Sequence, residues 1–119
     1  MSAATTDPSK QGVVRTILNR LPIPALPGWE SRTVLLDYPP STTAPPHTHP
    51  VSGVNYIIHG HVISQWENGE EEVYGPGEVF LDHAEKVHTV VRNPSETERL
   101  LVVVNYVIPV GVANVNFPE

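Results

Sequence analysis

The chain has 119 residues, the size of one domain with a single hydrophobic core. Apolar residues make up 39% of it beside 13 prolines and 8 glycines, so it is too apolar for a disordered chain and too rich in helix-breaking residues for a helix bundle. A formal net charge of −6 argues against nucleic acid or an anionic membrane as a partner, and the lack of cysteine excludes disulfides and thiolate metal sites.

Residues 1–12 are small and polar, and we expect a flexible N-terminal segment there. They contain no apolar stretch of the kind that a secretory signal needs. No apolar run in the chain approaches the roughly 18 residues of a membrane span. We therefore expect a soluble, cytoplasmic protein whose folded domain covers residues 13–119.

From Val13 onward, short runs rich in β-branched residues alternate with turns that contain proline or glycine. The runs are VVRTIL, WESRTVLLDY, VNYIIHG, HVISQW, EVFL, HTVV and RLLVVVNYVIPV. Between two of them, Asn68 and Gly69 predict a tight hairpin turn, because both residues tolerate positive φ. No window shows a convincing 3.6-residue period. The pattern predicts an all-β fold, a single small barrel.

Two of the six histidines stand one residue apart in the stretch PPHTHP, residues 45–50. Alternate side chains of an extended strand point to the same face, so His47 and His49 can bind one divalent ion together. The flanking prolines favour a stiff, extended backbone. A pair of this kind also occurs in ordinary surface loops, so it does not by itself establish a metal site.

A second region has a Pro-Gly turn, an apolar strand, a short loop and then a further histidine. Together the two regions resemble the two motifs of the cupin superfamily over about residues 13–110. The matching residues are His47, His49 and Gly60 in the first motif and Pro76, Gly77, Glu78, His88 and Asn93 in the second. The resemblance implies a single-domain cupin jelly-roll β-barrel. It also implies one divalent transition metal (Fe, Zn, Mn or Ni) bound by His47, His49 and His88.

The chain departs from the cupin pattern where the first motif has a glutamate, because this position is Gly53. Three histidines alone leave several coordination positions for water and substrate. We interpret Gly53 as widening the site for a ligand with two adjacent oxygens. Alternatively, a fourth ligand comes from Asn55, Gln65 or Glu67, although such side chains on strands commonly form cross-strand hydrogen bonds instead.

Two further residues are candidate acid–base groups beside the metal. His83 lies in the loop before His88, and Tyr56 lies on the strand that follows the first motif. The alternatives are solvent exposure for His83 and a place in the barrel core for Tyr56. His59 and His61 flank Gly60, and we interpret them as exposed turn residues.

These features predict a metal-dependent small-molecule enzyme acting on an oxygen-chelating substrate, which is aromatic, enolic or polyketide-like. The expected pocket lining is Val54, Ile57, Ile63, Phe80 and Val90. The reaction stays open between dioxygenation with Fe(II) and redox-neutral cyclisation, elimination or isomerisation, because imidazole binds all the metals concerned. The alternative is a non-catalytic cupin that senses or stores a metal or small ligand. The apolar segments LPIPALPG and VIPVGVANVNF predict a homodimer.

Overall fold

The computed structural model describes residues 12–117, and all its regular elements are β-strands. The strands are β1 (Val14–Pro22), β2 (Trp29–Tyr38), β3 (Thr43–Ala44), β4 (Gly53–His59), β5 (Val62–Trp66), β6 (Glu72–Tyr74), β7 (Val79–Asp82), β8 (His88–Arg92) and β9 (Leu100–Pro109). They form two antiparallel sheets with the strand orders β1-β2-β9-β4-β7 and β3-β8-β5-β6. The predicted all-β fold is confirmed. The N-terminal segment expected to be flexible lies, apart from residue 12, outside the described residues.

Strict alternation along β2 and β9 builds most of the core. Every second residue of each strand is buried, and the strands pair so that Val34 lies opposite Val104 and Leu36 opposite Val102. One face of this sheet therefore packs inward while the other meets solvent. Fully burying one such side chain contributes about 1.5–3 kcal/mol, which makes these two strands the centre of the domain's stability.

Two tight turns between strands contain glycines, and the backbone geometry of each turn accounts for the residue found there. Gly60, between β4 and β5, has a φ of 84°, and a Cβ there would lie 2.5 Å from the carbonyl oxygen of Arg99, so only glycine fits. Asn68 has a φ of 61° in the turn between β5 and β6, and the amide of Gly69 donates to the carbonyl of Trp66 at 2.9 Å. The predicted hairpin at these residues is confirmed.

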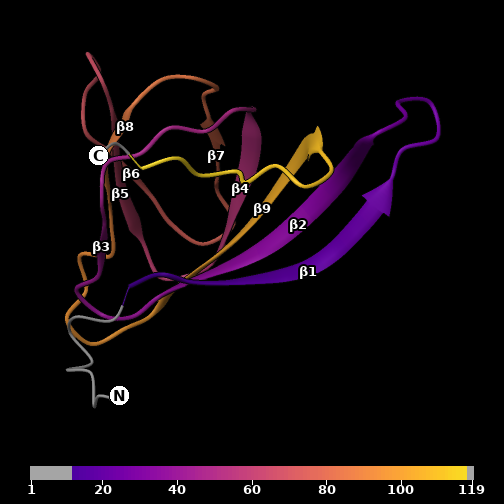
Figure 1. The fold of residues 1–119 in the computed structure, drawn as a ribbon. Helices are drawn as coiled ribbons and strands as arrows, with labels where there is room; N and C mark the ends of the chain where they lie inside the picture. Colours follow the sequence, from indigo (N-terminus) through magenta and orange to yellow (C-terminus); the bar gives the residue numbers. More distant parts are fainter. Residues whose placement is uncertain (1–11, 118–119) are drawn as a thin grey trace, which may run out of the picture.

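β1, β2 and β9 run side by side and extend beyond the part of the molecule that the small sheet covers (Figure 1). β1 is the edge strand of its sheet and is exposed along its whole length. Its apolar residues Val14, Ile17, Leu18 and Leu21 are 50–55% exposed. A long, apolar edge strand is a surface that proteins normally cover.

The segment after β9 turns back across the inner face of this extension (Figure 1). The amide of Asn116 donates to the carbonyl of Thr48 at 2.9 Å, and the amide of Thr48 donates back at 3.0 Å. The guanidinium of Arg32, buried and paired with Glu30 at 2.7 Å, donates to the carbonyl of Val112 at 2.9 Å. Residues 112–117 thus lie beside the two histidines of the first motif. The described residues contain no helix that is long and apolar enough to cross a membrane.

Candidate metal centre

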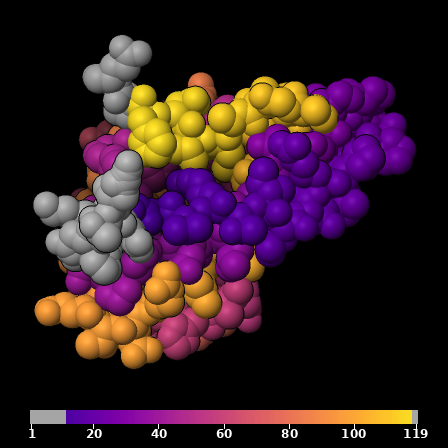
Figure 2. All heavy atoms as spheres, turned by 60° about the horizontal axis from the view of Figure 1, so that its bottom comes forward, coloured from indigo at the N-terminus to yellow at the C-terminus, as the bar shows by residue number. Residues whose placement is uncertain are grey.

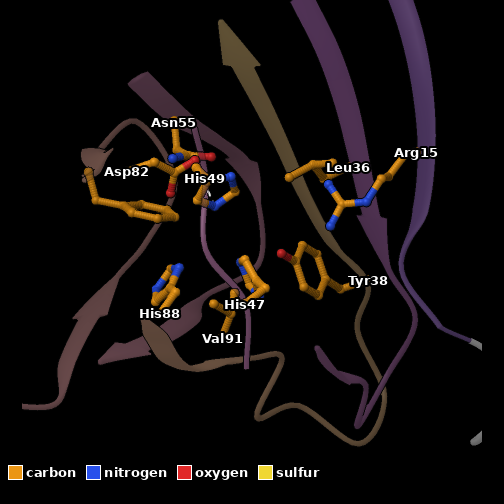
Figure 3. A pocket seen from close by; sticks show the side chains of 10 residues that line it. Arg15, Leu36, Tyr38, His47, His49, Asn55, Asp82, His88 and Val91 are labelled. Carbon is orange, nitrogen blue, oxygen red and sulfur yellow. Dashed lines mark ion pairs between the residues drawn. The ribbon is translucent and has the colours of Figure 1, made fainter. Parts of the chain in front are cut away.

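The fold brings the three histidines of the two motifs together. His47 and His49 lie in the extended segment between β3 and β4, and His88 is the first residue of β8. His47 and His88 form an isolated antiparallel bridge, with amide-to-carbonyl distances of 2.8 and 3.3 Å. All three side chains are buried, and one ring nitrogen from each lies within 4.8 Å of the others (Figure 3). This is the ligand set that the sequence motifs predicted.

Backbone carbonyls orient the rings of the first two histidines. The Nδ1 of His47 lies 2.7 Å from the carbonyl oxygen of Pro45, and the Nδ1 of His49 lies 2.6 Å from that of Asn114. A carbonyl only accepts, so each Nδ1 carries the hydrogen, and in the neutral ring Nε2 keeps its lone pair for a metal. Such hydrogen bonds fix the tautomer and the direction of metal-binding histidines. Burial lowers the pKa of His47, which keeps its ring neutral.

His88 is held from β5, the neighbouring strand. Its Nε2 lies 2.7 Å from the hydroxyl of Ser64, and its ring stacks on Trp66 with centroids 3.8 Å apart. Its Nδ1 is buried and has no hydrogen-bond partner. Burial, and then the nearby His47 and His49, lower the pKa of His88 to about 3, so the ring is a neutral ligand at physiological pH. An unpartnered buried nitrogen is costly, and a bound metal would remove that cost.

The role of β5 could have been found from the sequence. Alternation along VISQW places Ser64 and Trp66 on the inner face and Gln65 on the outer one, as the structure has them. The carbonyl of Asn114 gives no comparable signal, because it comes from a segment whose position depends on tertiary packing.

The three histidines line a small cavity of about 20 Å³, room for roughly one water or ion. Its other lining residues are Arg15, Leu36, Tyr38, Asn55, Phe80, Asp82 and Val91 (Figure 3). Of the five lining residues expected from the sequence, only Phe80 is among them. Val54 is 48% exposed, because it points to the outer face of β4. The expected apolar lining is therefore not found around this cavity, apart from Phe80.

Gly53 leaves no open space for a substrate. It faces the interior, and a Cβ added there would lie 3.3 Å from Cγ2 of Val104 and 3.4 Å from the carbonyl oxygen of Asn105. Those contacts are as close as packed atoms come. The interpretation that Gly53 widens the site is therefore corrected: this position is filled by β9.

The three residues considered as a fourth ligand differ in position. Asn55 lines the cavity, is 2% exposed, and its amide nitrogen has no hydrogen-bond partner. Gln65 points away and donates to the carbonyl of Gly69 at 3.0 Å. Glu67 follows the end of β5 and does not line the cavity. Gln65 and Glu67 are thus removed as candidates, because both lie outside the inner face of β5.

The carboxylate that does reach the cavity was missed in the sequence. Asp82 ends β7, is 6% exposed, and its Oδ2 lies 3.6 Å from the Nε2 of His49. The sequence alone suggests a loop residue here, because Asp82 directly follows the apolar run EVFL and precedes His83. The alternation of VFLD, with Phe80 and Asp82 on one face, was the available signal.

Neither candidate acid–base residue lies in this cavity. Tyr56 is 48% exposed on the outer face of β4, since its neighbours Asn55 and Ile57 point inward. The ring of His83 is exposed and meets the edge of Trp66 at 4.9 Å. It lines a second hollow of about 360 Å³, which shares Asp82 with the ion cavity and includes exposed residues of the outer face. The structure therefore does not bring Tyr56 and His83 into the cavity of the three histidines, and their acid–base role stays a prediction.

Two other polar side chains, those of Tyr38 and Arg15, line the cavity beside the histidines. Tyr38 ends β2, and its hydroxyl points toward His47 (Figure 3). Burial raises its pKa, so the side chain is a neutral phenol that can donate a hydrogen bond. The charge of Arg15 acts against this rise and lowers the pKa of His47. Among the described residues Arg15 forms no ion pair, so its guanidinium is available to an acidic ligand.

Comparison with known proteins agrees with this architecture. The family model of the cupin domain matches residues 34–105. The chain belongs to the cupin family. No curated protein sequence matches it.

Solved structures share the fold at low sequence identity. A conserved protein with a double-stranded β-helix domain from Klebsiella pneumoniae subsp. pneumoniae MGH 78578, described as uncharacterized, is 21% identical with a TM-score of 0.70, over 95% of this chain and 90% of that one. KdgF from Halomonas sp. is 20% identical with a TM-score of 0.62, over 82% and 79%. DMSP lyase DddQ from Ruegeria pomeroyi DSS-3 is 17% identical with a TM-score of 0.61, over 73% of this chain but 42% of that one. These likenesses confirm the cupin jelly roll.

Proposed function

We propose that this cupin is a metal-dependent enzyme that acts on a small, oxygen-chelating substrate at one divalent transition metal. One observation carries the proposal: three buried imidazoles converge, and the other nitrogen of each ring is already bound by Pro45, Asn114 or Ser64. Buried histidines with a purely structural role use their ring nitrogens in hydrogen bonds, so three free nitrogens that converge on one point support a metal site. Fe, Zn, Mn and Ni all suit this donor set. When bound, such an ion supplies Lewis-acid polarisation of a substrate oxygen.

A second hollow beside the ion cavity offers room for the body of the substrate. It measures about 330 Å³ and lies between the inner face of the large sheet and residues 113–117. Arg15 lines both spaces, so they adjoin at its side chain. The segment after β9 lies next to β1 here (Figure 2). The size is at the low end of ligand pockets in proteins, which suits an aromatic or enolic molecule.

Different residues of the chain would bind the carbon skeleton of the substrate, attract its acidic oxygen and donate a hydrogen bond to it. Apolar walls from Val34, Val104 and Phe117 take the carbon skeleton and exclude water. The guanidinium of Arg15, which forms no ion pair with any residue from 12 to 117, attracts an acidic oxygen, and its fork geometry suits a carboxylate or an enolate. Tyr38, held neutral by burial, donates its phenolic hydrogen toward a substrate oxygen.

These groups favour redox-neutral elimination, cyclisation or isomerisation, because they stabilise an enolate and move a proton. The names of two proteins with this fold, a DMSP lyase and an oxalate oxidase, indicate that it hosts both redox-neutral and oxidative chemistry. At their low identity to this chain the names carry no assignment. Dioxygenation is therefore the alternative that the experiment has to separate.

The test begins with the metal content of protein purified without chelator. About one equivalent of a transition metal is expected. The loaded protein is then mixed with catechol, acetylacetone and simple 2-hydroxy acids, under air and under argon. Turnover under argon supports the redox-neutral assignment, and turnover that needs oxygen replaces it by dioxygenation. Metal binding without turnover of any chelator favours the sensor or storage role, and protein that binds no metal overturns the proposal.

A further inference from the structure

Gly53 and Asp82 are directly paired residues of two neighbouring strands. Gly53 begins β4 and Asp82 ends β7, and the register of the antiparallel pair sets them opposite each other. Directly opposite residues project from the same face of a sheet, with Cβ atoms about 4.5–5.5 Å apart. Both positions face the interior. The position that resembles the cupin glutamate has lost its side chain, and the residue across from it is a carboxylate.

The carboxylate of Asp82 is buried beside the three histidines and has few partners among the described residues. It is 6% exposed, and no described residue donates a hydrogen bond to either of its oxygens. Its ion-pair partner among the described residues is His49, whose Nε2 faces Oδ2 while Nδ1 donates to the carbonyl of Asn114. In the neutral ring this Nε2 carries a lone pair, so nitrogen and carboxylate together present two metal-binding atoms. A buried carboxylate is costly unless it is paired, and a cation bound between Asp82 and His49 would stabilise it.

The distance between these two atoms fits joint coordination of one ion. Imidazole nitrogen and carboxylate oxygen bind Zn²⁺ at roughly 2.0–2.2 Å, so two such ligands at a tetrahedral angle lie about 3.4 Å apart. Oδ2 of Asp82 lies 3.6 Å from Nε2 of His49. Asp82 also lines the cavity that holds all three histidines, and its side chain points toward His49 (Figure 3).

We propose that Asp82 is the fourth protein ligand of the metal, so that the carboxylate comes from β7, opposite Gly53 of β4. The inference rests on the proposed function, because it needs the three histidines to bind an ion. Three neutral imidazoles and one carboxylate leave a dipositive ion with a net charge of +1. Asn55 also lines the cavity, and its neutral amide is the competing fourth ligand.

The experiment uses Zn²⁺ and Co²⁺ with the full-length chain and the variants Asp82→Ala, Asp82→Asn and Asn55→Ala. Asp37→Asn is the matched control, since it removes the same charge from a carboxylate paired with Arg99 at the surface. Asp82→Ala should lower the Zn²⁺ affinity by more than about tenfold, the least that loss of an outer partner costs. The visible absorption of the Co²⁺ form should shift, because the set of donor atoms changes. Asp37→Asn should leave both unchanged.

Thermal unfolding of the metal-free proteins is a second measurement, in which the variant should be more stable although it binds metal more weakly. Removing the buried negative charge should raise the melting temperature in Asp82→Asn, which keeps the shape of the side chain, if the neutral His49 leaves that charge uncompensated. A purely structural role predicts a lower melting temperature and unchanged metal affinity. Should Asp82→Ala fail to fold, Asp82→Asn carries the affinity and absorption measurements.

The outcomes separate this inference from the proposed function. If the wild-type chain binds metal and both Asp82 variants keep its affinity and Co²⁺ spectrum, Asp82 is no ligand and the three-histidine centre stands. A loss confined to Asn55→Ala assigns the fourth position to the amide and overturns the inference. If the wild-type chain binds no metal, the proposed function fails and the inference fails with it.

Discussion

The ring of His88 stacks on the indole of Trp66, with centroids 3.8 Å apart and an interplanar angle of 7°. The two residues are cross-strand partners of β8 and β5. The hydroxyl of Ser64, from the same face of β5, holds the Nε2 of the ring at 2.7 Å. One strand therefore fixes both the plane and the rotation of this histidine.

Replacing Trp66 with alanine should weaken both the fold and the metal site. Loss of a buried tryptophan costs roughly 3–5 kcal/mol of unfolding free energy. Without the stacked indole the ring of His88 can rotate, so metal affinity should fall as well. A metal titration of the folded protein measures this loss. Trp66→Phe keeps an aromatic face and should recover most of the affinity. Equal affinities in the two variants would count against a positioning role for the stack.

Replacing His88 with alanine should remove the metal and leave the barrel folded. The hydrophobic strands β2 and β9 carry the stability, while the variant leaves the hydroxyl of Ser64 without its partner at a cost of about 1–3 kcal/mol. Metal analysis and circular dichroism check the two parts. His59→Ala is the control, because that imidazole is exposed beside Glu98. A full metal equivalent in His88→Ala would show that the ion lies elsewhere.

The metal-free protein should lose stability as the pH falls from about 6.5 toward 3. Burial lowers the pKa of His88 to about 3 and also lowers that of His47, whereas in the unfolded chain both titrate near 6.5. Between these values the unfolded state binds more protons, so unfolding free energy rises with pH by at most about 1.4 kcal/mol per unit for each histidine. Urea unfolding across this range tests it. His88→Asn should flatten the dependence; an unchanged slope would contradict the assignment.

Arg15→Gln should weaken binding of an anionic chelator by roughly tenfold without changing metal content. The charge-assisted hydrogen bonds lost are worth about 1.5–3 kcal/mol when buried, and less at this partly exposed position. Titration of the loaded protein with a hydroxy acid measures the effect. Arg20→Gln, on the same strand but paired with Glu30, is the matched control. Identical affinities in the two variants would remove Arg15 from the substrate site.

We also propose a homodimer in which the exposed edge strand β1 is covered. Sedimentation at micromolar concentration should give twice the monomer mass of 13.1 kDa. Leu18→Lys should promote dissociation, because it places a charge in the apolar edge. Val73→Lys, at an exposed position on β6 of the other sheet, should have no effect. A wild-type mass near 13.1 kDa would disprove the proposal.

The β-strands and the three histidines could be predicted from local sequence patterns, because strand alternation and motif spacing can be recognised within short stretches of the chain. The same alternation also predicts the orientation of Tyr56. If Gly53 and Asn55 face inward, Tyr56 must face outward, away from the metal site. It would also have placed Asp82 beside the site once β7 was set against β4.

Other parts of the site had no local signal. Arg15 lies on a strand that is exposed along its length, so no periodicity marks its contact with the cavity. The carbonyl of Asn114 is identical in kind to every other carbonyl in the chain. Only the packing of distant segments makes either of them part of the site.

The bond between Asn114 and His49 has a consequence for biosynthesis. All three histidines are synthesised before the segment that orients His49, since this segment follows β9. Until this segment docks, the imidazole is free to exchange tautomers and turn away. The proposed metal site is therefore complete only once residues 112–117 have docked, and a chain truncated before residue 114 should bind metal more weakly than the full-length protein.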